Sequence, residues 1–121
     1  MMHELAIAES VVEVAMRHAR GRRVTKVELR VGHLRQVVPS ALAFAFELTT
    51  RGTELEGAGL EIAAVPVAGV CRTCGAHTPL PELPLTCRQC GGFDVEVTEG
   101  EELSVDALEL EEAEEREGAA R

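Results

Sequence analysis

All four cysteines of the chain fall within one short stretch, where they form two Cys-x-x-Cys pairs. The pairs are Cys71 with Cys74 and Cys87 with Cys90, and twelve residues separate them. A Cys-x-x-Cys turn holds two thiolates on neighbouring corners of the backbone, so two turns supply the four soft donors of a tetrahedral metal site. Glycine follows each pair and allows the backbone to turn back with a positive φ. The stretch therefore predicts one site with four cysteine ligands, and Zn(II) is the metal that suits it.

Other uses of four cysteines are two disulfides, four unrelated thiols or a rubredoxin-like iron site. Disulfides are disfavoured because no signal peptide precedes the chain. Iron stays open, since four thiolates bind it in the same geometry. With cysteine at all four positions no coordination position is left for water, so we expect a structural site and no hydrolytic zinc chemistry.

The composition argues against a nucleic-acid or membrane function. The 121 residues carry a net charge of −9, which would repel a phosphate backbone. Aromatic residues make up 2%, too few for binding by base stacking. No apolar run approaches the roughly 18 residues of a membrane span. We expect a soluble cytoplasmic protein in a compartment that keeps thiols reduced.

The N-terminal part predicts a helix, a strand and a second helix. Residues 1–19 have apolar positions at three- and four-residue steps, and Gly21 follows. Apolar and polar residues alternate over residues 24–31, which predicts a half-buried strand. Pro39 opens a second helix that ends near Thr50, with a wide apolar face that should be buried. The predicted apolar positions are Leu5, Ala8, Val12, Ala15, Met16 and Ala19 in the first helix, and Leu42, Phe44, Ala45, Phe46 and Leu48 in the second.

Three further strands are predicted, at residues 60–64, 93–97 and 103–110. Pro66 suggests that the first of them leaves its sheet or lies at an edge. In the last, the apolar alternation slips by one residue between Val105 and Leu108, which predicts a bulge near Asp106 or Ala107.

These elements predict an α+β fold in which two helices pack on one face of a three-stranded sheet, with an inserted zinc-ribbon module. The predicted domains are residues 1–69 plus 99–112, the zinc module at 70–98, and an acidic flexible tail at 113–121.

The chain resembles the HypA/HybF family of hydrogenase nickel-incorporation proteins, and the resemblance extends to about Glu111. Each matching segment is weakly specific alone, but together, in order and at matching separations, they are specific. The segments are Met2-His3-Glu4, residues 28–32, Pro39, residues 43–47, Arg51-Gly52-Thr53, the two Cys-x-x-Cys pairs and residues 99–103.

The resemblance implies a small nickel metallochaperone that passes Ni(II) to the large subunit of [NiFe]-hydrogenase, and in some organisms towards urease maturation proteins. It implies a HypB-type GTPase as partner. One transient Ni(II) would bind at the Met2-His3-Glu4 motif, through His3 and nearby backbone nitrogens. One Zn(II) would bind Cys71, Cys74, Cys87 and Cys90, with a structural or regulatory role.

Met1 is a departure from the family pattern, in which the histidine is the second residue. If Met1 is retained, the free amine, two amides and the His3 imidazole lie in line, an arrangement that itself binds Ni(II) or Cu(II) in a plane. Of the other histidines, His18 should be solvated and His33 should lie in a turn. His77 should be a surface residue, although it could replace a cysteine as ligand or bond a thiolate.

Three functions remain to be distinguished, and none is enzymatic, because no catalytic triad, phosphate loop or paired catalytic carboxylates are discernible. The leading hypothesis is the nickel metallochaperone. The alternatives are a zinc-ribbon adaptor that binds only proteins, without specific nickel binding, and a nucleic-acid-binding ribbon.

Overall fold

The computed structural model describes residues 2–111, with side chains from His3 onward. It divides into two compact units. The helical unit comprises residues 2–29, 38–61 and 105–111 of the described chain, and the cysteine unit comprises residues 30–37 and 62–104. The predicted acidic tail lies outside the described residues, and the predicted domain boundaries remain a prediction.

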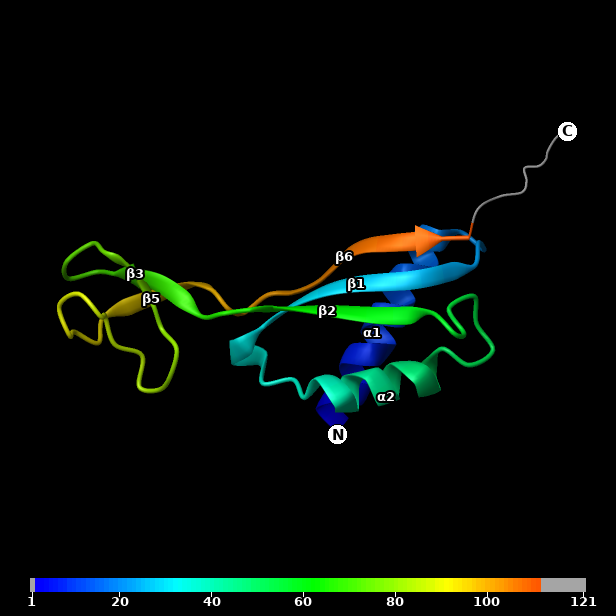
Figure 1. Ribbon diagram of the computed structural model, residues 1–121, viewed down its shortest axis with the longest axis horizontal. Helices are drawn as coiled ribbons and strands as arrows, with labels where there is room; N and C mark the ends of the chain where they lie inside the picture. Colours follow the sequence, from blue (N-terminus) through cyan, green and yellow to red (C-terminus); the bar gives the residue numbers. More distant parts are fainter. Residues whose placement is uncertain (1, 112–121) are drawn as a thin grey trace, which may run out of the picture. The chain divides into compact units, whose positions relative to one another are not determined.

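The predicted two-helix, three-stranded architecture is confirmed. Helix α1 spans Met2–Ala19 and helix α2 spans Pro39–Thr49, with a short 3-10 turn at His33–Arg35 before α2. Strand β1 (Val24–Gly32) lies between β2 (Gly59–Val65) and β6 (Leu103–Leu110), as Figure 1 shows. The sheet therefore joins neighbours that are distant in sequence, because β6 follows the whole cysteine module.

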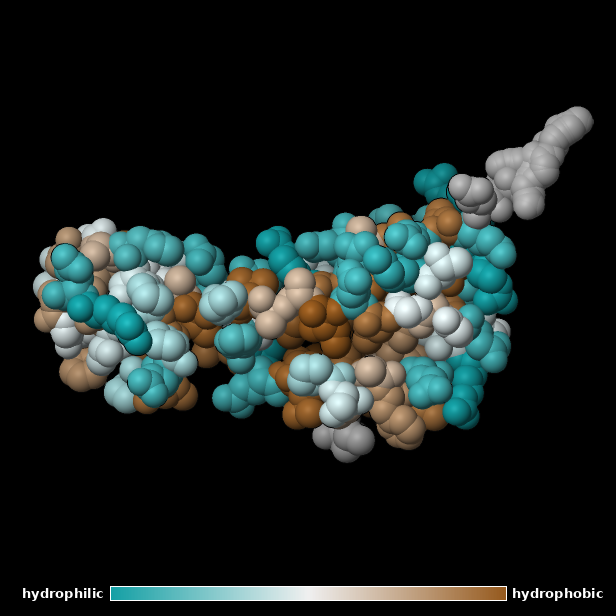
Figure 2. Space-filling view, viewed as in Figure 1, coloured by the Kyte–Doolittle hydropathy of each residue, from teal (hydrophilic) through white to brown (hydrophobic). Residues whose placement is uncertain are grey.

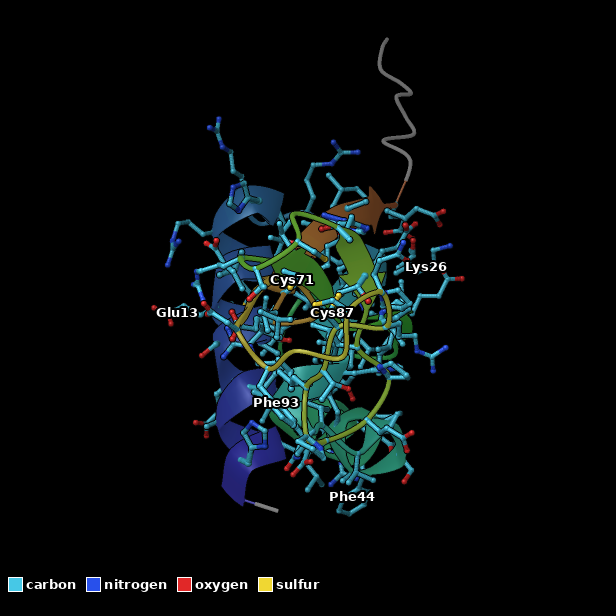
Figure 3. The ribbon with its side chains drawn as sticks, turned by 90° about the vertical axis from the view of Figure 1, so that its left-hand side faces the viewer. Glu13, Lys26, Phe44, Cys71, Cys87 and Phe93 are labelled. Carbon is cyan, nitrogen blue, oxygen red and sulfur yellow. The ribbon has the colours of Figure 1, made fainter. Side chains whose placement is uncertain are left out.

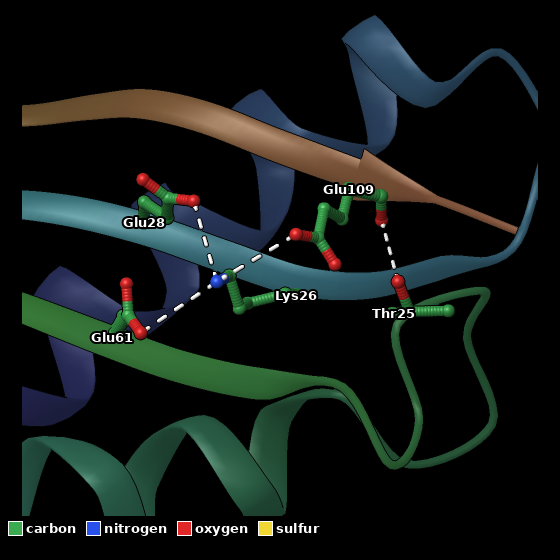
Figure 4. Close-up of polar contacts among 5 residues, drawn as sticks. All are labelled: Thr25, Lys26, Glu28, Glu61 and Glu109. Carbon is green, nitrogen blue, oxygen red and sulfur yellow. Dashed lines mark hydrogen bonds and ion pairs between the residues drawn. The ribbon is translucent and has the colours of Figure 1, made fainter.

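The two faces of β1 differ in the way that its alternating sequence predicts. Val27 and Leu29 of the helical unit are buried, and Figure 1 shows both helices beside this part of the sheet. Val31, which belongs to the cysteine unit, is also buried. On the opposite face the Lys26 ammonium lies 3.5 Å from Glu28, 3.6 Å from Glu61 and 3.6 Å from Glu109, as Figure 4 shows. These carboxylates raise the pKa of Lys26, Glu61 most of all. One lysine thus offsets like charges carried by all three strands.

Helix α1 buries four of the six residues predicted for its apolar face: Ala8, Val12, Ala15 and Ala19. The other two, Leu5 and Met16, are 37% and 38% exposed, so the prediction was wrong for them. Ile7 and Val11 are buried in their place. The apolar residues cover more than one helix face, and periodicity alone did not select the face that α2 and the sheet would contact.

The apolar face of α2 is only partly buried. Leu42, Ala45 and Phe46 are buried as predicted, but Phe44 is 53% exposed and Leu48 is 41% exposed. Figure 2 shows the resulting hydrophobic surface over this helix. The prediction that the whole wide face is buried was wrong, because the sheet and α1 cover only one side of α2.

The cysteine unit contains a second three-stranded sheet, of which the sequence predicted only one strand. Strand β3 (Ala68–Cys71) lies between β4 (His77–Pro79) and β5 (Val95–Glu99), antiparallel to both. Strand β5 begins two residues later than predicted, and Phe93 before it is 70% exposed. Gly69 is required at its position, because a Cβ there would lie 2.1 Å from the carbonyl oxygen of Glu96 on β5.

The core of the helical unit can be tested on α2, which carries one buried and one exposed leucine. Leu42 is 0% exposed, so Leu42→Ala should lower the free energy of unfolding by about 2–5 kcal/mol. Leu48→Ala, on the exposed side of the same helix, should cost about 1 kcal/mol or less. Urea denaturation followed by circular dichroism measures both, and equal losses would contradict this assignment of the core.

Candidate metal centres

The two Cys-x-x-Cys pairs fold into turns of the same geometry. The Gly75 N–H donates to the Cys71 carbonyl at 2.8 Å, and the Gly91 N–H donates to the Cys87 carbonyl at 2.8 Å. Both glycines have φ of 78°, in the left-handed region that other residues rarely adopt. The positive φ predicted for the residue after each pair is confirmed.

The four sulfur atoms converge on one point. All lie within 4.8 Å of one another, with the Cys71 and Cys90 Sγ atoms 3.6 Å apart and the Cys74 and Cys87 Sγ atoms 3.7 Å apart. A tetrahedron with Zn–S bonds of about 2.3 Å has sulfurs about 3.8 Å apart. Figure 3 labels Cys71 and Cys87, whose sulfurs belong to this group. The donor set therefore fits Zn(II).

The thiols in this cluster have strongly divided pKa values. The Cys74 N–H, with that of Thr73, lowers the pKa of Cys71 to about 6, and the Cys90 N–H, with that of Gln89, lowers the pKa of Cys87. Each sulfur of lowered pKa lies beside a sulfur of raised pKa. The pKa values divide in this way because two adjacent thiolates repel each other when no cation is bound, so ionisation of one thiol opposes ionisation of its neighbour.

The pKa of Cys74 is raised to about 11, although the Ala76 N–H acts to lower it; loss of hydration and the neighbouring sulfurs outweigh that hydrogen bond. The pKa of Cys90 is raised despite the Gly92 N–H, chiefly by the sulfur of Cys71. A divalent cation would supply the charge that allows all four sulfurs to be thiolates together. With four cysteine ligands it would have no open position, so the site is suited to holding structure.

His77 is the fifth donor residue near the cluster in sequence. It begins β4, and its Nε2 lies 3.2 Å from the Glu99 Oε2 on the exposed surface. His77 does not belong to the group of converging donors, and one nitrogen of its ring is already hydrogen-bonded to Glu99.

His3 lies in the first turn of α1, and its side chain is exposed. The first four N–H groups of a helix have no acceptor within the helix. An exposed imidazole therefore stands beside backbone nitrogens that make no helical hydrogen bonds. The prediction for Met1 falls outside the described residues, and nothing is described of the Met2 side chain.

Glu4, the third residue of the predicted nickel motif, has a role that sequence reasoning missed. Its side chain is 4% exposed, and its Oε2 accepts a hydrogen bond of 2.9 Å from the Val38 N–H. Val38 is the residue that precedes the first turn of α2, where negative charge is favourable. This hydrogen bond lowers the pKa of Glu4. The carboxylate thus joins the beginnings of α1 and α2.

The remaining histidines lie apart from any cluster of donors in the described chain. His18 is exposed, and its Nδ1 lies 2.9 Å from the Val14 carbonyl oxygen one turn earlier in α1. His33 begins the 3-10 turn, as its predicted place in a turn requires. None of the helices in the described chain is long and apolar enough to cross a membrane.

Together these features define a two-unit protein in which four cysteine sulfurs are placed as zinc ligands would be. The family model described as "Hydrogenase/urease nickel incorporation, metallochaperone, hypA" matches residues 2–110. The chain belongs to this HypA family of nickel metallochaperones, whose members act in hydrogenase maturation.

Curated relatives match over nearly their whole length. "Hydrogenase maturation factor HypA" of Geotalea uraniireducens (strain Rf4) is 50% identical over 110 residues, which cover 91% of this chain and 100% of the relative. The protein of the same name from Trichodesmium erythraeum (strain IMS101) is 37% identical over 111 residues, covering 92% of this chain and 97% of the relative. These names describe maturation factors and not enzymes.

Solved structures share the fold. The "Solution structure of the Ni metallochaperone HypA from Helicobacter pylori" aligns with a TM-score of 0.65 at 21% identity, covering 88% of this chain and 96% of that one. The "Solution structure of HypA protein" aligns with a TM-score of 0.67 at 23% identity, covering 91% and 97%.

The ligand set of the cysteine site can be tested by substitution. Cys90→Ala should lower the zinc content from one per chain to near zero, because three thiolates leave one corner of the tetrahedron unfilled. His77→Ala should retain zinc. Elemental analysis of the purified untagged proteins, with iron measured in the same samples, gives the readout. Loss of metal in His77→Ala would show that this histidine is a ligand.

The role of Glu4 can be tested through its pKa. Glu4→Ala should unfold at a lower urea concentration than wild type. Glu4→Gln keeps an oxygen acceptor for the Val38 N–H, so its loss of stability should be smaller than that of Glu4→Ala. Because the folded pKa is lowered, the stabilisation by the carboxylate is complete above the ordinary value of 4.5 and is lost as pH falls through the folded value. The difference in the free energy of unfolding between wild type and Glu4→Gln should therefore shrink in acid. A difference that does not change with pH would contradict a stabilising role for the ionised carboxylate.

Proposed function

We propose that this protein binds one Ni(II) at its N-terminal motif and delivers it to the large subunit of [NiFe]-hydrogenase during maturation. His3 supplies the imidazole, and the backbone nitrogens of the first turn supply further donors. Nickel is the cargo in this proposal, and one Zn(II) at the cysteines is resident. Membership of the HypA family supports the cargo, and the exposed His3 is the observation on this chain that carries the site.

The two proposed metal sites suit their different tasks. Four thiolates favour zinc in a tetrahedron, whereas Ni(II) accepts planar coordination by nitrogen. A delivered ion must also be released, and an exposed site at the end of a helix is open to a partner. The proposed partners are a HypB-type GTPase, the hydrogenase large subunit and, in some organisms, urease maturation proteins.

Glu4 contributes to this proposed site chiefly by holding its first turn in place. Its carboxylate bonds the Val38 N–H, so coordination by that carboxylate would break the link to α2. Its backbone N–H hydrogen-bonds its own carboxylate, so this amide must give up that bond and its proton before it can bind Ni(II). We therefore assign Glu4 a positioning side chain, with its backbone nitrogen as a further donor once it is deprotonated. Met2 contributes a backbone donor.

Nickel titration of matched variants tests the proposal. Wild type should bind one nickel per chain in addition to zinc, and His3→Ala should lose that nickel while it keeps its zinc. His18→Ala is the control, because His18 is an exposed histidine on the same helix and should bind no nickel. Isothermal titration calorimetry and elemental analysis provide the readouts. Nickel binding that survives His3→Ala would favour the zinc-ribbon adaptor that binds proteins alone.

The contribution of Met1 needs a separate measurement. Mass spectrometry of the N-terminus shows whether Met1 is retained, and acetylation of the amine blocks it as a donor. Unchanged nickel affinity after acetylation would exclude the ligand set of amine, two amides and imidazole.

A further inference from the structure

The end of helix α1 and the turn that follows it carry four exposed arginines, which form a basic cluster: Arg17, Arg20, Arg22 and Arg23. All four belong to the helical unit. No acidic residue occurs between Glu13 and Glu28, although the whole chain has a net charge of −9. The basic cluster is therefore a local reversal of the sign of the charge.

Ion pairs and the helix end account for only part of this cluster. Arg17 lies in the last turn of α1, where cations are favourable, and its Nη2 lies 3.7 Å from the Glu13 Oε2. Arg20, Arg22 and Arg23 lie beyond the end of the helix. Within residues 2–111, none of these three forms an ion pair with a carboxylate. Their charges are therefore not neutralised by the described chain.

Two of the unneutralised guanidinium groups are held in place by backbone carbonyls. The Arg22 Nη2 donates to the Glu111 carbonyl at 2.9 Å. The Arg23 Nη1 donates to the Glu56 carbonyl at 3.0 Å. A carbonyl fixes the direction of a guanidinium group without removing its charge, and the remaining N–H groups can bind a carboxylate.

The C-terminal end of β6 lies against the basic cluster. The Glu111 N–H donates to the Arg23 carbonyl at 2.9 Å, and the Glu111 carbonyl accepts the bond from Arg22. Figure 1 shows this end of β6 beside the turn that joins α1 to β1. Residue 112 is therefore attached to the chain at the cluster itself.

The sequence after Glu111 has the complementary charge. Glu112, Glu114 and Glu115 are three of the next four residues. An extended chain advances about 3.3 Å per residue, so four residues reach roughly 13 Å. This reach exceeds two helical turns of about 5.4 Å each, which is enough to pass along the end of α1.

We propose that residues 112–115 bind the basic cluster of the same chain, with their carboxylates on the guanidinium groups of Arg20, Arg22 and Arg23. Planar guanidinium groups suit carboxylates, which they bind through two parallel hydrogen bonds. The family model matches residues 2–110, so membership of the family assigns no role to this segment.

The bound segment would control access to the basic cluster. A single exposed ion pair is weak, but attachment at Glu111 gives residues 112–115 an effective concentration in the millimolar range. An acidic segment of another protein must compete with that concentration before it reaches the arginines. The cluster is thus an acidic-peptide site that the chain itself occupies.

Competition with an acidic peptide tests the proposal in full-length zinc-loaded protein. The probe is fluorescent polyglutamate, and fluorescence anisotropy gives its dissociation constant. The triple variant Glu112→Gln, Glu114→Gln and Glu115→Gln should bind the probe roughly three- to tenfold more tightly than wild type at about 0.05 M salt. The difference should disappear near 0.5 M salt, because salt screens exposed charges.

A second triple variant controls for net charge. Glu47→Gln, Glu82→Gln and Glu101→Gln remove the same charge at exposed positions away from the cluster, and should tighten probe binding less.

The arginine side of the contact has its own matched pair. Added to the 112/114/115 variant, Arg20→Gln should reverse the gain in affinity for the probe. Arg51→Gln, at an exposed arginine outside the cluster, should leave most of that gain. Nitrogen-15 NMR locates the contact without a probe. The Nε–H resonances of Arg20, Arg22 and Arg23 should move in the 112/114/115 variant and stay in place in the control triple variant.

Several outcomes would overturn the proposal. They are equal effects of the two triple variants, arginine resonances that ignore residues 112–115, and a 112/114/115 variant that binds no probe. Equally tight, Arg20-dependent binding of the probe to wild type and variant would assign the cluster to an acidic partner instead. Nickel binding at His3 enters none of these measurements, so this proposal and the proposed function can fail independently.

Discussion

The mutual repulsion of four sulfur atoms is the constraint on which the cysteine unit depends. Two backbone turns bring the sulfurs within 4.8 Å of one another, and the pKa values of adjacent thiols are driven apart. The rest of this unit offers little to hold such an arrangement. Its buried side chains are few and mostly small: Val31, Val67, Ala68, Cys71, Thr78, Leu80 and Cys87. A divalent cation bound by the four thiolates would therefore act as much of the core of this unit.

The helical unit is held together by different interactions. Aliphatic side chains from both helices and from β1 form its core, which contains one phenylalanine, Phe46. The hydrogen bond from the Val38 N–H to Glu4 adds a directional link, because it holds the first turn of α1 against the start of α2. His3 occupies that same first turn. Glu4 belongs to the motif that the family resemblance assigns to nickel, and its side chain also holds that motif against the start of α2.

Charge compensation acts on the outer face of the same sheet. There Lys26 offsets acidic residues from all three strands.

The sequence by itself determined most of the local elements and which four cysteines would come together. Alternation in residues 24–31, Pro39 at a helix start and the glycines after each Cys-x-x-Cys pair are signals carried by adjacent residues, and each was confirmed. Only the tertiary structure decided which apolar residues are buried. Leu5, Met16, Phe44 and Leu48 are exposed because burial depends on what packs against a helix face, and periodicity describes that face alone. The short strands β3 and β4 and the burial of Glu4 were missed for the same reason. Strand pairing and the Glu4 to Val38 hydrogen bond join residues that are separated in the sequence, and only the folded chain brings them together.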